Sequence, residues 1–211
     1  MTATVPALED QNVGKLIKAI GIDTQPIYVP VKHDRSAMIH DCFANVAAKV
    51  KSEGGSRVIG WQIFKTKHLI EAEFHAIWSS DQHELIDITP NIASFSEILF
   101  IEDKERSYRG AQVDNIRINI CGVSLVDDLI SVCESIFKIE NKGVRVHQYE
   151  LTLSGEEQKI WTILQDCKKG LSLMLAQGST KHQKCFCGKD KYRKCHGKFV
   201  EQLPYFLNES P

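Results

Sequence analysis

The sequence predicts a mixed α+β fold with a small C-terminal appendage. Three observations support it: helical spacing near the N-terminus, a block of β-rich runs between 56 and 102, and helical periodicity between 123 and 176. Helices set apart from a block of strands are typical of α+β domains with an antiparallel sheet. With 211 residues, 43% of them hydrophobic, the chain can bury a substantial core.

The N-terminal part is expected to supply two helices and an edge strand. Residues 9–20 have amphipathic helical spacing and are followed by a glycine. The prolines in 25–31 are compatible with an edge segment and exclude a central strand. A second helix is expected over 37–52, with Asp34 and Ser36 as candidate N-caps.

Five later runs have the composition of strands, and two have the periodicity of helices. The strand candidates are residues 56–64, 68–78, 83–89, 96–102 and 112–120. Residues 123–137 have helical period, and Ser154 with Glu157 forms a capping-box signature for a long helix ending near 176.

Composition and charge limit the environment and the partners. No run is apolar enough to span a membrane and no signal peptide is recognisable, so a cytoplasmic protein with reduced cysteines is expected. The net charge is −1, but residues 181–199 carry seven basic side chains and only one acidic one. This basic tail predicts docking to a protein partner or an anionic surface, although a merely solvated tail has the same composition.

The basic tail also concentrates soft metal ligands. Cys185, Cys187, Cys195 and His196 form the pattern C-x-C-x7-C-H. Three thiolates and one imidazole can complete a tetrahedron around Zn²⁺ and leave no position for water. The spacing therefore predicts a structural zinc ion, whose binding would supply folding free energy to a module too small to fold alone.

The stretch from Cys185 to Gly197 resembles the SEC-C zinc motif, which occurs at the C-terminus of the SecA translocation ATPase and on many unrelated proteins. The matching parts are CFCG, the KY pair with its basic neighbours, and CHG. Phe186 stands in place of the usual proline, and the loop between the second and third ligands is one residue shorter. The resemblance implies a docking role in general.

The segments HDCFANVAAKV, SRVIGWQIF and AEFHAIWSSDQHELIDITP resemble the core of transglutaminase-like and papain-like cysteine proteins. Such proteins carry a cysteine near the start of a helix, a histidine on a following strand and an aspartate on the next. The resemblance implies a papain/transglutaminase-like core, with Cys42 as nucleophile, His75 as base and Asp87 as orienter. In the expected organisation, this body covers residues 1–150, the C-terminal helix 151–178 and the zinc module 179–199.

Strand parity gives separate support for two of these residues. In residues 68–78 the apolar side chains at even positions share one face, and His75 lies on the other. If Ser79 pairs with His83 across a three-residue loop, His75 lies directly opposite Asp87. A carboxylate at that distance can orient an imidazole, which in turn stabilises a neighbouring thiolate for acyl transfer.

Other interpretations of these residues remain open. Cys42 shares helical spacing with apolar residues and can be a buried small hydrophobe. His75 can be a structural partner of Asp87, or can form a second metal site with Glu71 and Glu73. The oxyanion donor is not evident: Gln25 is one candidate, and the amides at the start of the helix near Cys42 are another.

The leading hypothesis is thus a cytoplasmic cysteine-dependent acyl-transfer protein, hydrolase or transglutaminase-like, with a structural zinc tail for docking. The alternative is a non-enzymatic zinc-binding adaptor with a papain-like shape. Nucleic-acid binding rests only on the basic tail with Phe186 and Tyr192 interleaved. Few apolar residues are expected to link the tail to the body, so removal of the chain after Gln177 is expected to leave the body stable.

Overall fold

The computed structural model describes residues 2–91, 93–110, 112–147 and 150–208. The chain forms two compact units, Thr2–Ile120 and Cys121–Pro211. The first contains an antiparallel sheet with helices and the second is mainly helical, so the expected α+β class is confirmed. Compactness alone does not test independent folding, and the domain boundaries at 150 and 178 remain predictions.

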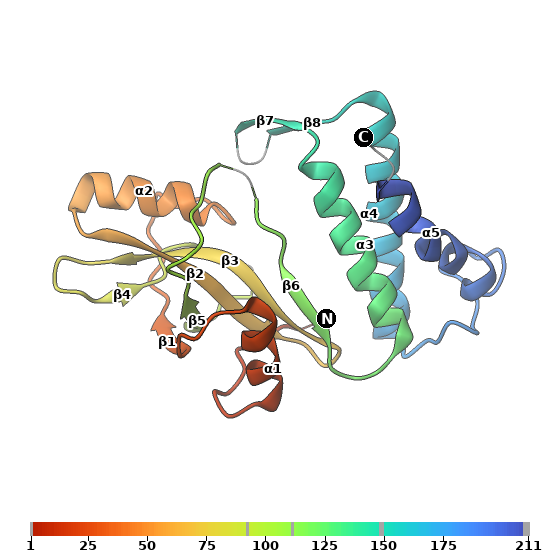
Figure 1. Ribbon diagram of the computed structural model, residues 1–211, viewed down its shortest axis with the longest axis horizontal. Coiled ribbons are helices and arrows are strands. Elements are labelled where there is room, and N and C mark those ends of the chain that lie inside the picture. Colours follow the sequence, from red (N-terminus) through yellow and green to blue (C-terminus); the bar gives the residue numbers. More distant parts are fainter. Residues whose placement is uncertain (1, 92, 111, 148–149, 209–211) are drawn as a thin grey trace. The chain divides into compact units, whose positions relative to one another are not determined.

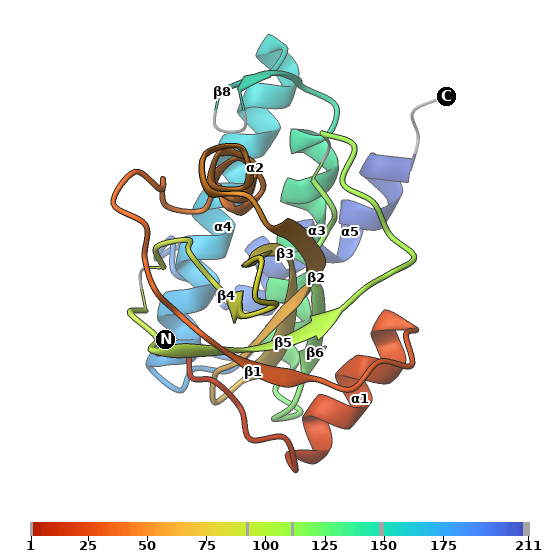
Figure 2. The same cartoon turned by 90° about the vertical axis from the view of Figure 1, so that its left-hand side faces the viewer.

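An antiparallel, nearly closed sheet organises Thr2–Ile120 (Figure 1). Its strands are β1 (Ile27–Pro30), β2 (Ser56–Lys65), β3 (Leu69–Ser79), β4 (Leu85–Ile86), β5 (Glu97–Glu102) and β6 (Ile116–Asn119). Their order is β1-β5-β2-β3-β4, and β6 pairs with the same edge of β3 as β4 does. Figure 2 shows β1 alongside β5, as expected for an edge strand. A parallel bridge between Val31 and Asp87 links the two ends of the sheet and nearly closes it.

The two faces of the sheet carry different side chains. Even-numbered apolar residues of β3 lie in the main core with helices α1 (Gln11–Ile20) and α2 (Cys42–Glu53). Ile77 instead lies in a second cluster with Val29, Ile98 and Phe100. The alternation expected for β3 is therefore confirmed, and His75 lies on the side of Ile77.

Helix α1 begins and ends close to the expected residues. The Asp10 side chain accepts a hydrogen bond from the Asn12 amide at the N-terminus of the helix. Gly21 closes it with a left-handed φ of 81°, a conformation that glycine adopts without steric penalty. This helix illustrates how far local cap signals can fix an element.

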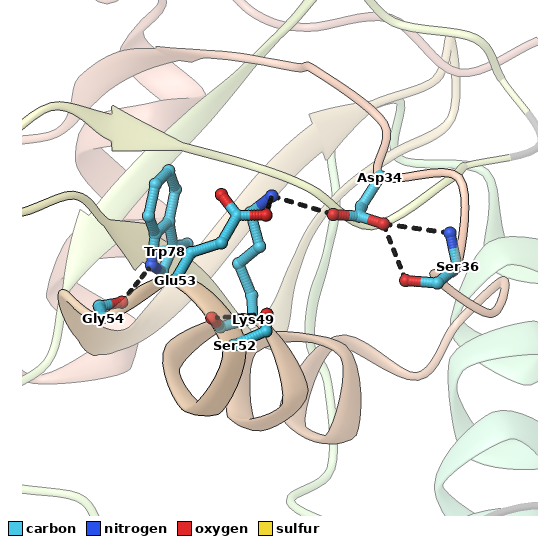
Figure 3. Close-up of polar contacts among 7 residues, drawn as sticks. All are labelled: Asp34, Ser36, Lys49, Ser52, Glu53, Gly54 and Trp78. Carbon is cyan, nitrogen blue, oxygen red and sulfur yellow. Dashed lines mark hydrogen bonds and ion pairs between the residues drawn. The ribbon is translucent and has the colours of Figure 1, made fainter.

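The expected start of the second helix at residue 37 is wrong, because α2 begins at Cys42. Asp34 does not cap a helix: its carboxylate accepts from the amide and hydroxyl of Ser36 and forms an ion pair with Lys49 at 2.9 Å (Figure 3). His40 has a φ of 62°, which is incompatible with a right-handed helix. The helix starts only after this residue, which puts Cys42 in its first turn.

The expected pairing of Ser79 with His83 is also wrong, because Ser79 pairs with Leu85. The turn is longer than expected: the Ser80 amide donates to Glu84 O, and the Ser80 hydroxyl accepts from the amides of Gln82 and Glu84. The shift is by two residues, so the parity of the strand is retained. Asp87 therefore does not pair with His75 in the ladder but still belongs to the same side of the sheet.

The unit Cys121–Pro211 is built on packed helices. It contains α3 (Ser124–Glu140), α4 (Gly155–Ala176), a 3₁₀ turn (Tyr192–Lys194) and α5 (His196–Asn208), and a hairpin of β7 (Val144–His147) and β8 (Glu150–Thr152) that the sequence did not indicate. The predicted capping box of Ser154 and Glu157 is present. No helix within the described residues is long and apolar enough to cross a membrane.

The basic tail is packed against α3 and α4, contrary to the expectation that few apolar residues link it to the body, to which the residues of α3 were assigned. Tyr192 is fully buried, and Val200 and Leu203 are 3% and 2% exposed. The Phe186 ring lies where a side chain on Gly170 of α4 would project. The absence of a side chain at Gly170 therefore allows the tail to pack directly on the helix.

Gly170→Ala tests this packing. The added Cβ would lie 2.3 Å from the Phe186 ring, so overpacking is expected to lower the free energy of unfolding of the helical unit by about 1–3 kcal/mol. Gly14→Ala in α1 is the matched control: its Cβ would meet nothing within 4 Å, so the higher helix propensity of alanine should stabilise the protein by about 0.5–1 kcal/mol. Urea unfolding measures both, and stabilisation by both substitutions would contradict the packing of Phe186 on Gly170.

Candidate active site and metal centre

Cys42, His75 and Asp87 line one pocket in the unit Thr2–Ile120. The pocket has a volume of about 270 Å³. Its other lining residues are Ala3, His40, Gln62, Phe64, Glu73, Thr89, Pro90, Asn91, Ala93 and Phe95. All three candidate catalytic residues of the sequence thus meet at one cavity.

Cys42 reaches the pocket from the first residue of α2. The adjacent Phe43 stacks on Tyr108 with ring centroids 3.8 Å apart and also contacts Phe74, which fixes the start of the helix against the sheet. Amides in the first turn of a helix have no intrahelical acceptor and carry partial positive charge. Cys42 thus lies at a helix N-terminus and lines the same pocket as His75.

His75 interacts electrostatically with both Asp87 and Cys42. Its Nε2 is 3.2 Å from Asp87 Oδ1, an ion-pair distance without the alignment of a full hydrogen bond. Burial lowers the pKa of His75, but the interactions with Asp87 and then with Cys42 carry that pKa well above 6.5. A protonated imidazole between a carboxylate and a thiol is the arrangement that a thiolate–imidazolium pair requires.

Asp87 is held by the turn that follows β4. Its Oδ1 accepts a hydrogen bond from the Thr89 amide at 3.0 Å. The Thr89 hydroxyl is 3.3 Å from the side-chain nitrogen of Asn45 on α2, which also bonds the backbone of Met38. The Asp-x-Thr sequence therefore connects Asp87 to the loop that precedes Cys42.

Two candidate residues of the sequence are not in the site. Gln25 is exposed and does not line the pocket. Glu71 accepts hydrogen bonds from Arg117 at 2.7 Å and Asn115 at 2.8 Å. Among the described residues, Glu71, Glu73 and His75 do not form a group of potential metal ligands.

Sequence reasoning missed Gln62, and it considered Glu73 only as a ligand of a second metal site. These residues pair across β2 and β3, two positions along the ladder from the pair of Gly60 and His75, and both line the pocket. The sequence did carry a signal for both residues, because each is polar within a strand. Gln62 interrupts the apolar run of β2, and Glu73 is two residues from His75 and so lies on the same side of β3. The pairing of the two strands was needed to bring them together.

The second site is a cluster of Cys185, Cys187, Cys195 and His196, which could hold a metal ion. The four potential ligand atoms lie within 4.8 Å of one another. His196 Nδ1 is 3.2 Å from Cys185 Sγ and 3.5 Å from Cys195 Sγ, and Cys187 Sγ is 3.4 Å from Cys195 Sγ. A tetrahedral zinc ion would hold such atoms about 3.6–3.8 Å apart, so only small movements are required.

The backbone around the cluster positions the cysteines and affects the pKa of Cys187. Gly188 has a φ of 77°, and its amide donates to Cys185 O in a tight turn. The Lys189 amide hydrogen-bonds Cys187 and lowers the pKa of that thiol. Burial, followed by the charge of Lys189, lowers the pKa of His196, which favours the neutral imidazole that binds a metal.

Cys167 lies on α4 close to this cluster but is not a member of it. It is 1% exposed, and burial together with the neighbouring thiols raises its pKa to about 12. A thiol that resists ionisation is a poor metal ligand. Cys167 is accordingly a core residue of α4.

No family model, curated protein or solved structure matches the chain. The resemblances to the SEC-C motif and to transglutaminase-like and papain-like proteins therefore remain predictions.

The metal centre leads to a prediction of one zinc ion per chain. Elemental analysis of reductively purified protein is expected to find zinc, and Cys187→Ser is expected to lose most of it because one of four ligands is removed. Cys121→Ser is the control, since Cys121 is an exposed thiol outside the cluster. Zinc-free wild-type protein, or equal zinc contents in the two variants, would contradict this assignment.

The loop before Cys42 leads to a prediction about acid stability. Hydrogen bonding to Lys49 and then to Ser36 holds the pKa of Asp34 well below 3.8, so its ionisation stabilises the fold above that pH. Because the pair is partly exposed, Asp34→Asn should lower the free energy of unfolding at pH 7 by about 0.5–1 kcal/mol.

The difference between Asp34→Asn and wild type should shrink as the pH falls from 5 towards 2.5, as measured by urea unfolding. The exposed Asp23, substituted in the same way, is the control and should differ little from wild type at any pH. A pH-independent effect of Asp34→Asn would show that the ion pair with Lys49 does not contribute.

Proposed function

We propose that the unit Thr2–Ile120 is a cysteine-dependent acyl-transfer catalyst of the hydrolase or transglutaminase-like kind. The observation that carries the proposal is the meeting of Cys42, His75 and Asp87 at one pocket, with the pKa of His75 raised by the charges of the other two. The nearly closed sheet with a helix that begins at the cysteine supports the papain-like interpretation of the fold.

In the proposed reaction the Cys42 thiolate attacks a carbonyl carbon and forms a tetrahedral intermediate. The first-turn amides of α2 stabilise the oxyanion, and the Gln62 side-chain amide can donate from the facing strand β2. Imidazolium at His75 protonates the leaving group as the thioester forms. His75 then accepts a proton from the water or amine that attacks the thioester, the acyl product is released, and the Cys42 thiolate and His75 imidazolium are restored.

Asp87 acts through His75 in this scheme. Its carboxylate fixes the orientation of the ring and stabilises the imidazolium, while its hydrogen bond from Thr89 limits its own movement. Both the thiolate and the cysteine ligands of the tail require reducing conditions, which supports the expected cytoplasmic location.

We further propose that the zinc module docks the protein to a protein partner or an anionic surface. Six basic side chains of this module are exposed, at Lys184, Lys189, Lys191, Arg193, Lys194 and Lys198. Lys181 is excluded from this set because it pairs with Asp128 at 2.8 Å. A closed site with four protein ligands gives the metal a structural role, holding these cations in fixed positions.

Acyl labelling with 4-nitrophenyl acetate tests the catalytic proposal. Peptide mass spectrometry is expected to find acetyl-Cys42 at pH 7, formed faster than adducts of the exposed Cys121. His75→Asn is expected to slow this labelling about 10²-fold or more, and Asp87→Asn to slow it in the same direction. His83→Asn is the matched control, because His83 is exposed and its φ of 63° suits asparagine.

Equal labelling of Cys42 in wild type and His75→Asn would contradict the catalytic role of His75. A Cys42 that reacts no faster than Cys121 would favour the alternative, a non-enzymatic zinc-binding adaptor. Circular dichroism of each variant separates loss of chemistry from loss of fold.

A further inference from the structure

The lining of the pocket contains acidic side chains but no lysine or arginine. The two carboxylates are those of Asp87 and Glu73. Asp87 is paired with His75, so the negative charge of Glu73 is the one that remains available to a ligand. An anionic ligand would therefore meet repulsion in this pocket, whereas a cationic one would not.

Glu73 forms no ion pair within the described part of the chain, although His75, His40 and Arg117 act on its charge. No ion pair or side-chain hydrogen bond there involves its carboxylate, in contrast to Glu71, which is held by Arg117. Burial raises the pKa of Glu73, against the opposing influence of His75, while Glu71 raises it further and His40 and Arg117 lower it. A carboxylate that is partly desolvated and unpaired gains most from a bound cation.

The position of Glu73 relates it directly to His75, the candidate base. It lies two residues before His75 on β3 and shares its side of the sheet, a separation of about 6.6 Å along the strand. Phe64 and Phe95 add aromatic walls to the same pocket. Aromatic rings and a carboxylate together make a favourable environment for an ammonium or guanidinium group.

We propose that Glu73 binds a positively charged group of the substrate, so that the pocket selects acyl compounds carrying an ammonium or guanidinium. This inference rests on the proposed acyl-transfer function of Cys42. The cation lies beside Glu73, a few bonds from the carbonyl that Cys42 attacks. Glu73 is thus a specificity-determining residue, whereas Cys42, His75 and Asp87 perform the chemistry.

Charged thiol reagents test the cation site without requiring turnover. Cys42 in the full-length protein is labelled with the cationic 2-(trimethylammonium)ethyl, the neutral methyl and the anionic 2-sulfonatoethyl methanethiosulfonates, and the rates are followed on the Cys42 peptide. Glu73→Gln is expected to lower the ratio of cationic to neutral rates about tenfold, and Glu73→Lys to favour the anionic reagent. Glu84→Gln, an exposed glutamate in the β3–β4 turn, should leave the ratio unchanged.

The hydrolysis of acetylthiocholine and of its uncharged analogue 3,3-dimethylbutyl thioacetate provides the second measurement. A preference for the cationic thioester in wild type that is lost in Glu73→Gln is the expected result. If the labelling ratio depends on Glu73 but neither thioester is hydrolysed faster than in Cys42→Ser, the acyl-transfer function fails while the cation site stands. Equal labelling ratios in wild type, Glu73→Gln and Glu73→Lys would overturn the role of Glu73.

Discussion

The long antiparallel ladder between β2 and β3 is the constraint on which the candidate active site depends. It pairs Ser56 with Ser79 at one end and Lys65 with Ile70 at the other. Because side chains alternate along both strands, this one register fixes which residues enter the main core and which face the pocket. A shift by a single residue would turn His75 and Glu73 into the core and bring Phe74 and Ala76 to the pocket. The large apolar contribution of Trp61 and Phe74, which pack with ring centroids 5.1 Å apart, makes such a shift costly.

Burial of charge separates the structural carboxylates of this unit from the functional ones. Asp103 is 3% exposed, but it accepts from Trp61 and Arg106 and from two backbone amides, so its charge is satisfied within the fold. Asp87 is 1% exposed and accepts one hydrogen bond from the Thr89 amide, but the balance of its charge comes from His75, whose own charge depends on its protonation. Glu73 lacks such a partner among the described residues. The three carboxylates thus differ in what neutralises their negative charge. Donors of the fold neutralise Asp103, the protonated form of His75 neutralises Asp87, and in our proposal a cationic ligand neutralises Glu73.

Local signals in the sequence were sufficient for elements whose ends are set by neighbouring residues, and insufficient where distant contacts decide. Gly21 and the Ser154–Glu157 box fixed helix ends correctly because a positive φ and a capping hydrogen bond are local properties. The start of α2 was misplaced because Asp34 forms an ion pair with Lys49, which only the folded chain brings close. Parity made the polar side of β3 predictable, but Gln62 required the β2–β3 pairing as well. For the metal cluster, spacing was enough, since its four residues lie within one short segment.

Phe186 shows how a departure from a motif can carry structural information. The proline found here in the SEC-C motif, which the tail resembles, would stiffen the turn between Cys185 and Cys187, whereas the ring of Phe186 lies against Gly170 of α4 and 4.4 Å from the ring of His196. One side chain therefore contacts both the helix and a candidate metal ligand. The buried Tyr192 continues this contact, with its ring 6.4 Å from that of Phe186. Metal binding at this cluster would consequently act on the same small set of side chains as helix packing, so any folding free energy from a metal would be shared with α4 and would not be confined to the tail.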